Sequence, residues 1–371
     1  MEQTTLFLSA GDPSGDNAAS RLVKALRKLF PQLNVVGLGG EKLKELGQHQ
    51  LAEGSDLAIL GFWEVAKRYT FFRRLFNQCF EEIKHRRPIA VILVDYPGFN
   101  LRLARKIKKL GIPIIYYISP QVWAWGKRRV SEIKRLIDLM LVILPFEEEF
   151  FHRNGVSAHF IGHYLLEDIP NNYIRSPIPI NGTLSLLPGS RPQEIERMLP
   201  PMLQTANRFN RIHGTKTVVA GIKGCFDYDK LLNKYASENI IVSFDDSHKI
   251  IYESSLVLTA SGTATLETAI IGRPMVVVYR TELISYLIAH RLIKLDKIAL
   301  ANLVLGEKVV PELIQNRVKP EYILPELVKY HEDEQYMQRV KTKLDQVPEL
   351  LGGTGASERA ARMIAEHLRC A

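Results

Sequence analysis

Residues 256–279 limit the possible folds more than any other part of this chain. Within them an apolar β run enters a turn of small residues at 261–263, a helical stretch follows, and a second apolar β run closes the segment. Gly272 and Pro274 stand where the helix must end. This order predicts a β-loop-α-β unit, and the free backbone N–H groups at the start of its helix suit a phosphate. The alternative interpretation of the same residues is an ordinary strand-to-helix turn in which a hydroxyl side chain caps the helix.

The rest of the chain repeats this alternation of strand and helix. The strand candidates are Thr4–Ser9, Val35–Leu38, Ile89–Val94, Ile114–Ile118, Leu139–Leu144, Thr183–Leu187, Thr217–Ala220, Ile240–Ser243, Leu256–Thr259 and Met275–Tyr279. The helical stretches between them include Asn17–Leu29, Asn100–Leu110, Phe146–Asn154 and Arg191–Ile212. Such alternation predicts parallel sheets covered on both faces, with ligands at the carboxyl ends of the strands. We therefore expect an α/β chain of two doubly wound, Rossmann-like domains with a cleft between them.

The bulk composition narrows the class of protein. A length of 371 residues favours two domains, and the polar, proline-bearing segment 167–181 is the best linker, so we predict domains at 1–170 and 171–350.

The net charge of +9 suits anionic lipid or phosphorylated substrates, and nucleic acid ranks last because no nucleic-acid-binding motif is present. Three cysteines without a CxxC pair, and histidines without ligand spacing, predict no metal site. No apolar run reaches the roughly 18 residues of a spanning helix, so we expect any membrane contact to be peripheral.

Three loops of the N-terminal half follow strand candidates and carry side chains suited to chemistry. After the first strand, Asp12, Ser14 and Gly15 lie in a glycine-containing turn that could approach a ligand. Ser14 and Asp16 could equally be caps of the next helix. Asp95 ends another strand, where a carboxylate could act as a general base, or could cap the next helix or stabilise the turn. Trp123 stands beside three cations in a loop that could line a site for a phosphorylated sugar or lipid, or could be a core residue beside a basic turn.

A second phosphate-competent loop lies in the C-terminal half. Ser190 and Arg191 follow a strand and open a helix, and an arginine there can contact two diphosphate oxygens at once. Together with Ser261, Gly262 and Thr263, this loop gives one sheet two such sites. No GxxxxGK[ST] and no fitting GxGxxG is present, which counts against an NTPase and a conventional dehydrogenase.

Two stretches have the pattern of basic amphipathic helices, which bind anionic lipid surfaces. The first combines Phe71, Phe72 and Phe76 with Arg73 and Arg74. The second is 283–305. Packing of both apolar faces into the core is the alternative interpretation.

These pieces, in this order, resemble the lipid-A-disaccharide synthase family of GT-B glycosyltransferases over nearly the whole chain. The motifs that carry the resemblance are the segments 9–16, 95–100, 117–125, 144–147, 160–163, 187–195, 261–267, 310–315 and 355–359. The Ser-Pro-Gln-Val-Trp-Ala-Trp run at 119–125 is the most specific of them. Departures from the family are Asp12 in place of glutamate, the segment 299–302 without the proline that commonly precedes the asparagine, and Gly98 in place of a side chain.

The resemblance implies an inverting transfer without metal or cofactor. A 2,3-diacylglucosamine moves from UDP to the 6-hydroxyl of 2,3-diacylglucosamine 1-phosphate, which gives a β-1,6-linked disaccharide phosphate and UDP. Asp95 would be the base, Glu267 would bind ribose, and Asn302 and Gln315 would border the nucleotide; the diphosphate would lie on the two loops described above. The N-terminal domain would then face the acceptor and the membrane.

The resemblance also implies a C-terminal helix within 351–371 that crosses back to the N-domain, and a homodimer. We expect a cytoplasmic enzyme that associates peripherally with the inner membrane. Two alternatives stay open: a related GT-B activity such as a non-hydrolysing epimerase, and a membrane-bound protein that binds UDP-sugar lipids without catalysis.

Overall fold

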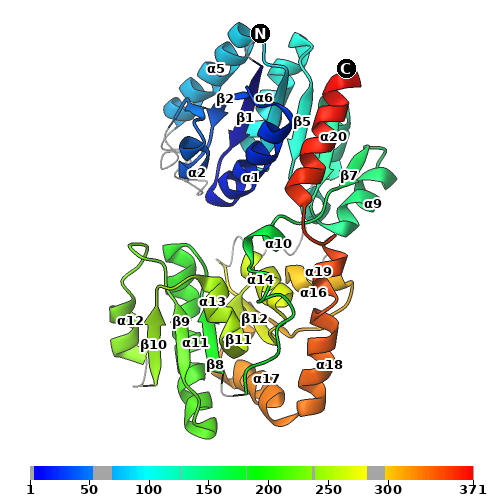
Figure 1. Ribbon diagram of the computed structural model, residues 1–371. Coiled ribbons are helices and arrows are strands. Elements are labelled where there is room, and N and C mark those ends of the chain that lie inside the picture. Colours follow the sequence, from blue (N-terminus) through cyan, green and yellow to red (C-terminus); the bar gives the residue numbers. More distant parts are fainter. Residues whose placement is uncertain are drawn as a thin grey trace. The chain divides into compact units, whose positions relative to one another are not determined.

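The computed structural model describes residues 4–52, 69–125, 127–180, 182–235, 239–281 and 297–370. The chain forms two compact units, which are described separately below. Unit 1 comprises Met1–Tyr164 together with Gly352–Ala371, and unit 2 comprises Leu165–Leu351 (Figure 1). Unit 2 is therefore inserted, as far as the order of the chain is concerned, between the body of unit 1 and its last helix.

Unit 1 is built on a seven-stranded parallel sheet in the order β3-β2-β1-β4-β5-β6-β7. Its strands are β1 (Thr5–Ala10), β2 (Asn34–Leu38), β3 (His49–Gln50), β4 (Ala90–Val94), β5 (Ile114–Tyr117), β6 (Leu139–Val142) and β7 (Ala158–Phe160). Its helices are α1 (Pro13–Leu29), α2 (Glu41–Glu45), α5 (Tyr69–Arg86), α6 (Pro97–Ile107), η1 (Lys108–Leu110), α7 (Val122–Trp125), α8 (Lys127–Leu136), α9 (Pro145–Arg153) and α20 (Ala356–Cys370). The central strand β4 is buried along its whole length, as a strand covered on both faces must be.

Unit 2 is built on a six-stranded parallel sheet in the order β10-β9-β8-β11-β12-β13. Its strands are β8 (Thr183–Leu187), β9 (Thr217–Ala220), β10 (Ile240–Ser243), β11 (Ser254–Ala260), β12 (Met275–Tyr279) and β13 (Glu312–Ile314). Its helices are α10 (Leu165–Asp168), α11 (Pro192–His213), α12 (Tyr228–Tyr235), α13 (Ser247–Tyr252), α14 (Thr263–Ile271), α16 (Leu300–Leu305), η2 (Gln315–Arg317), α17 (Pro320–Glu332), α18 (Glu334–Leu344) and α19 (Val347–Leu350). The predicted β-loop-α-β unit is β11-α14-β12.

The direction of the strand order reverses once in each sheet. In unit 1 this switch point lies between β1 and β4, and in unit 2 it lies between β8 and β11. Ligands of doubly wound sheets bind outside the carboxyl ends of the strands at such a point. The loops that the sequence singled out after residues 10, 94, 187 and 260 are the loops at these two switch points, so the fold selects the same segments as the sequence does.

Several predicted boundaries were wrong by a few residues, for local reasons. The first helix begins at Pro13 and not at Asn17, because proline is suited to the first helical position and Asp12 caps the helix from the preceding turn. The helix predicted to begin at Asn100 begins at Pro97, because proline is again suited to the first helical position. The strand predicted to reach Ile118 stops at Tyr117, and Ile118 takes a left-handed backbone conformation with φ 65°.

The last helix, α20, packs against α1 within unit 1 (Figure 1). Its apolar side is buried, including Ile364 and Ala365. At its start, the Arg359 Nε donates to the carbonyl oxygen of Ile161 over 2.7 Å, and Glu358 forms an ion pair with Lys28 at 2.7 Å. Among the described residues, no helix combines the length and apolarity that a bilayer crossing requires.

Candidate active site

The first loop of unit 1 is a helix cap built against a second loop. Asp12 is the N-cap of α1, and its carboxylate accepts a hydrogen bond from the Gly15 N–H over 2.7 Å. Gly15 is buried, whereas Ser14 is exposed. A Cβ on Gly11 would lie 2.5 Å from the ring of Tyr96, so only glycine fits there. The cap of α1 is thus Asp12, and not Ser14 or Asp16, the two caps that the sequence suggested. The loop lies directly against the loop that follows β4.

Asp95 lies at the end of β4 in a partly buried position. It is not the cap of α6, because the N-cap residue of that helix is Tyr96 and no side chain makes the capping hydrogen bond. Burial raises the pKa of the Asp95 carboxyl from 3.8 to about 7; the negative charge of Asp12 adds to the rise, the Tyr96 N–H opposes it, and Glu147 adds a little more. A carboxylate with a pKa near neutrality can accept a proton and still be ionised at the working pH, as a general base requires.

Trp123 is held by a buried carboxylate that the sequence did not mark as functional. Glu147 accepts hydrogen bonds from the Ser119 hydroxyl at 2.7 Å and the Trp123 indole N–H at 3.0 Å. The backbone N–H groups of residues 143 and 144 donate to its other oxygen. Burial raises the pKa of Glu147, and these donors oppose that rise. The ring of Trp123 also meets Phe146 edge-on at 5.0 Å. Glu147 therefore fixes the orientation of the 119–123 loop.

In unit 2, two helices begin side by side at the carboxyl ends of paired strands. β8 and β11 are parallel neighbours, with Thr259 opposite Leu187. Arg191 is the N-cap of α11 and Gly262 is the N-cap of α14, and neither helix has a side-chain capping bond among the described residues. Ser190, Arg191, Gly262 and Thr263 are exposed, and the hydroxyl of Ser261 donates to the Ile298 carbonyl at 3.2 Å. The alternative, that a hydroxyl of this turn caps α14, is therefore not what the structure shows.

Such a pair of uncapped helix starts is suited to an anion. N–H groups in the first turn of a helix commonly lack an intrahelical partner, although the Thr265 N–H of α14 donates to the Gly262 carbonyl at 3.1 Å and Pro192 of α11 has no N–H. The positive end of each helix dipole lies at this edge of the sheet. Arg191 adds a guanidinium at the same edge, where it forms a weak ion pair with Glu194 at 3.4 Å. The structure thus brings together five of the residues predicted to bind a diphosphate.

Glu267 lies one turn into α14, beside a histidine that sequence reasoning missed. His248 Nε2 lies 3.7 Å from the Glu267 carboxylate, and its Nδ1 lies 3.7 Å from Asp246. Burial lowers the pKa of His248, but Glu267 and Asp246 outweigh this effect, so the pKa is raised overall. No motif marks His248; its place near the start of α13, just beyond the carboxyl end of β10, is the only signal in the sequence.

Asn302 and Gln315 lie in the short helices on either side of β13, Asn302 in α16 and Gln315 at the start of η2. Asn302 is fully buried; its amide donates to the Val310 carbonyl at 2.9 Å and to Glu312 at 2.8 Å, and its oxygen accepts from the N–H groups of Val309 and Val310. All of its polar groups are used inside the fold, so it shapes the loop in front of β13. Gln315 follows β13 with φ 52°, and its side-chain oxygen accepts a hydrogen bond from the Thr281 N–H at 3.3 Å.

Comparison with known proteins identifies the family. A family model described as lipid-A-disaccharide synthetase matches residues 6–366. The chain belongs to the lipid-A-disaccharide synthetase family. The lipid-A-disaccharide synthase of Myxococcus xanthus is 37% identical over 98% of this chain and 97% of its own length. That of Trichlorobacter lovleyi is 35% identical over 97% of this chain and 96% of its own length. The family predicted from the sequence is therefore confirmed, and the chain is an enzyme of lipid A disaccharide synthesis.

Solved structures show that this synthetase family member has the GT-B fold. MurG of Acinetobacter baumannii superposes with a TM-score of 0.59 at 14% identity, covering 98% of this chain and 100% of MurG. The UDP-GlcNAc 2-epimerase of Neisseria meningitidis, solved with UDP-GlcNAc bound, superposes with a TM-score of 0.62 at 11% identity, covering 99% of each chain. At these identities the likeness concerns the fold, and it confirms the predicted fold class of two doubly wound domains.

The aromatic helix α5 of this synthetase family member is only partly available to a membrane. Leu75, Cys79 and Ile83 are buried in the core of unit 1. Phe76 meets the ring of Phe99 at 5.7 Å, and Phe71 also packs against the core. Phe72 is partly exposed and Arg73 and Arg74 are exposed. Of the second predicted membrane stretch, residues 283–296 lie outside the described residues.

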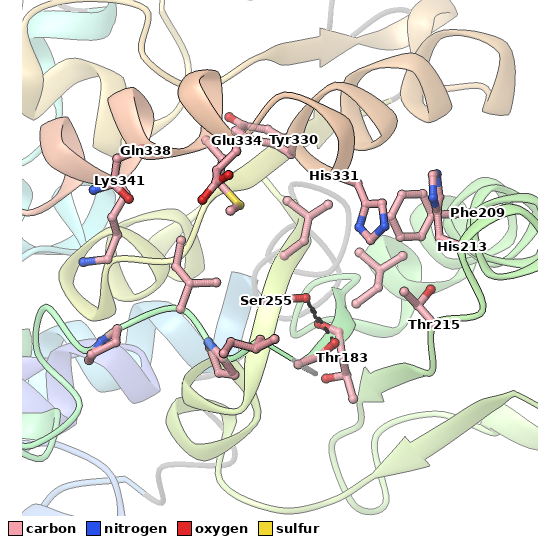
Figure 2. A pocket seen from close by; sticks show the side chains of 18 of the residues that line it. Thr183, Phe209, His213, Thr215, Ser255, Tyr330, His331, Glu334, Gln338 and Lys341 are labelled. Carbon is pink, nitrogen blue, oxygen red and sulfur yellow. Dashed lines mark hydrogen bonds between the residues drawn. The ribbon is translucent and has the colours of Figure 1, made fainter.

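A cavity of about 1070 Å³ lies at the opposite edge of the unit 2 sheet (Figure 2). Thr183 and Ser255 line it at the amino ends of β8 and β11, together with a cluster of Phe209, His213 and His331. None of the described site residues predicted from the sequence lines this cavity. Within the described ranges, no group of three or more histidine, cysteine, aspartate or glutamate side chains is arranged to hold a metal ion.

Proposed function

We propose that this protein joins UDP-2,3-diacylglucosamine to 2,3-diacylglucosamine 1-phosphate, forming the β-1,6-linked lipid A disaccharide 1-phosphate and UDP. The observation that carries the proposal is the family match across residues 6–366, which includes both units. The site geometry supports it, because unit 1 supplies a carboxylate with a pKa near 7 and unit 2 supplies two adjacent anion-binding helix starts.

The reaction is a single displacement with inversion at the anomeric carbon. Asp95 accepts the proton of the acceptor 6-hydroxyl while the hydroxyl oxygen forms the new bond to the anomeric carbon. The bond from that carbon to the UDP oxygen breaks, and its electron pair leaves with UDP. Negative charge then develops on the diphosphate, where the N–H groups that open α11 and α14, with Arg191, stabilise it. Glu267 accepts hydrogen bonds from the ribose hydroxyls. These groups supply the stabilisation without a metal ion or a cofactor.

The direct test is to incubate the purified protein with both substrates in detergent micelles, with EDTA present, and to analyse the products by mass spectrometry. Disaccharide phosphate and UDP are the expected products. Consumption of the UDP-sugar without need of the acceptor would favour an epimerase, and UDP binding without turnover would favour a non-catalytic lipid-binding protein. Asp95→Asn is the control for the base, since it keeps the shape of the side chain and removes the proton acceptor.

A second proposal concerns location: the enzyme binds peripherally to the cytoplasmic face of the inner membrane through the exposed end of α5. Exposed Arg73 and Arg74 beside the partly exposed Phe72 support it, because cations flanking an aromatic ring favour an anionic lipid surface. The double variant Arg73→Glu, Arg74→Glu should lose flotation with vesicles containing phosphatidylglycerol. The matched control is Arg362→Glu, Arg369→Glu, which changes the net charge equally on exposed positions of α20. Equal flotation of the two variants would refute the proposal.

Assembly as a homodimer also stays a prediction for this family member. Sedimentation equilibrium of the detergent-solubilised protein would test it, and a single mass near the 42.2 kDa of one chain at all concentrations would contradict it.

A further inference from the structure

The backbone that presents Asp95 is strained at two consecutive residues. Asp95 has φ 41° and Tyr96 has φ 44°, so both adopt the left-handed conformation that residues with a Cβ avoid. Such a conformation persists only where the surrounding structure holds it, and it concentrates at functional sites. α6 begins immediately afterwards at Pro97, so the two strained residues are the whole connection between β4 and α6.

Two buried side chains hold the carbonyl group of Asp95. The Tyr116 hydroxyl donates to it over 2.6 Å, and the Asn100 side-chain amide donates to it over 2.8 Å. Both donors are fully buried. On its other side, the Asp95 N–H donates to the Tyr117 carbonyl at 3.3 Å. Both backbone polar groups of the strained residue are therefore fixed by the protein.

Asn100 is itself held from two further strands. Its oxygen accepts a hydrogen bond from the Ser9 hydroxyl at 2.7 Å, and its amide lies 3.1 Å from the Val94 carbonyl. Ser9 belongs to β1, Val94 to β4 and Tyr116 to β5, three adjacent strands of the sheet. Because strands are the most rigid part of such a fold, the turn is anchored to a stiff frame rather than to another loop.

We propose that Asn100 and Tyr116 are positioning residues for the base of the reaction: they hold the left-handed turn that keeps the Asp95 carboxylate in its enclosed place beside the first loop. The inference rests on the proposed function, in which Asp95 accepts the proton. Neither residue touches substrate in this proposal. If either donor is lost, the turn relaxes, and the carboxylate moves away from the acceptor hydroxyl and toward solvent.

The test compares Tyr116→Phe and Asn100→Ala with the parent enzyme in the glycosyl-transfer assay from about pH 5 to about pH 9. We expect kcat to fall about fivefold for Tyr116→Phe, which removes one hydrogen bond, and about a hundredfold for Asn100→Ala, which removes several. The KM for the UDP-sugar should stay within about twofold, because the nucleotide-binding loops lie in unit 2. The acidic limb of the pH profile should move to lower pH, since a less buried carboxylate has a lower pKa.

The matched control is Tyr330→Phe. Tyr330 is also a buried tyrosine whose hydroxyl donates to a backbone carbonyl, that of Met275 at 3.2 Å, but it lies in unit 2. It should leave kcat and the pH profile unchanged. If Asn100→Ala does not fold, Tyr116→Phe alone tests the positioning role, because this substitution removes only a hydroxyl and leaves Asn100 in place.

An acidic limb that stays at the parent position overturns the inference, whether or not kcat falls, because a loss of kcat alone is what general destabilisation would produce. Asp95→Asn separates the two proposals. If Asp95→Asn remains active, the base assignment fails. If Asp95→Asn is inactive while the positioning variants keep the parent pH profile, the proposed function stands and the positioning role fails.

Discussion

Replacing Asp95 by asparagine should make the protein more stable at pH 8 while it abolishes turnover. The carboxyl has an ordinary pKa of 3.8 in the unfolded chain, and burial with the charges of Asp12 and Glu147 raises it to about 7 in the folded protein. Between these two values the folded state retains a proton that the unfolded state has lost. The stability contributed by the protonated carboxyl is therefore complete below about pH 4 and is lost as the pH rises through about 7.

The size of the effect follows from the shift. Three pKa units at about 1.36 kcal/mol each give about 4 kcal/mol at pH 8, as an order of magnitude. Asparagine has nearly the same shape as the protonated acid and cannot ionise, so it avoids this cost. At about pH 4 the free energies of unfolding of the two proteins should be nearly equal, and at pH 8 that of Asp95→Asn should be higher by up to about 4 kcal/mol.

Urea denaturation at the two pH values, followed by far-UV circular dichroism, measures the difference. Contributions from all other titrating groups cancel in the comparison, because both proteins contain them. The control is Asp138→Asn, since Asp138 forms an ion pair with Lys108 and accepts the Ile114 N–H at 2.9 Å, and its loss should destabilise at pH 8. A difference between Asp95→Asn and the parent that is the same at both pH values, or a loss of stability at pH 8, would refute the reasoning.

Two further substitutions test other parts of the site, and a third tests a buried guanidinium of unit 2. Glu147→Gln should lower the free energy of unfolding by about 1–3 kcal/mol in urea denaturation and raise the KM for the acceptor, because an amide cannot accept from all the donors and the Trp123 indole loses its acceptor; an unchanged KM would separate Trp123 from the acceptor site. His248→Ala should reduce the preference for UDP over 2′,3′-dideoxy-UDP by about threefold in titration calorimetry, since Glu267 loses the partner that orients it; an unchanged preference would make the pair irrelevant to ribose. Arg273→Met should cost about 3–5 kcal/mol of stability in urea, because this fully buried guanidinium donates to three backbone carbonyls, and equal stability would contradict that account.

The sequence predicted the parts of the fold that rest on local signals. Long apolar runs such as 275–279 gave the central strands, because a strand buried on both faces must be apolar throughout. The strands β3, β7 and β13 were missed, since two or three residues are too few to show a pattern. Residues 11–16 were predicted to form a loop before the first helix, although Asp12 is the cap of that helix and Pro13 is its first residue.

The site was predictable where a residue's role follows from its place after a strand. The loops at 190–191, 261–263 and 95 all qualify, because parallel strands end at one edge of their sheet. Glu147 and Asn100 were not assigned roles, because theirs depend on contacts with Ser119 and Ser9, which lie 28 and 91 residues away in the chain. No local pattern encodes such pairs.

The return of α20 to unit 1 has a consequence for how the chain is made. α20 covers α1 but follows the whole of unit 2 in the sequence. During synthesis, unit 2 emerges from the ribosome and can fold while unit 1 still lacks this helix, so the side of α1 that α20 later covers is exposed to solvent for that time. Exposed apolar surface of this kind favours aggregation or chaperone binding. The N-terminal unit is thus the last to be completed, the reverse of the order in which its residues leave the ribosome.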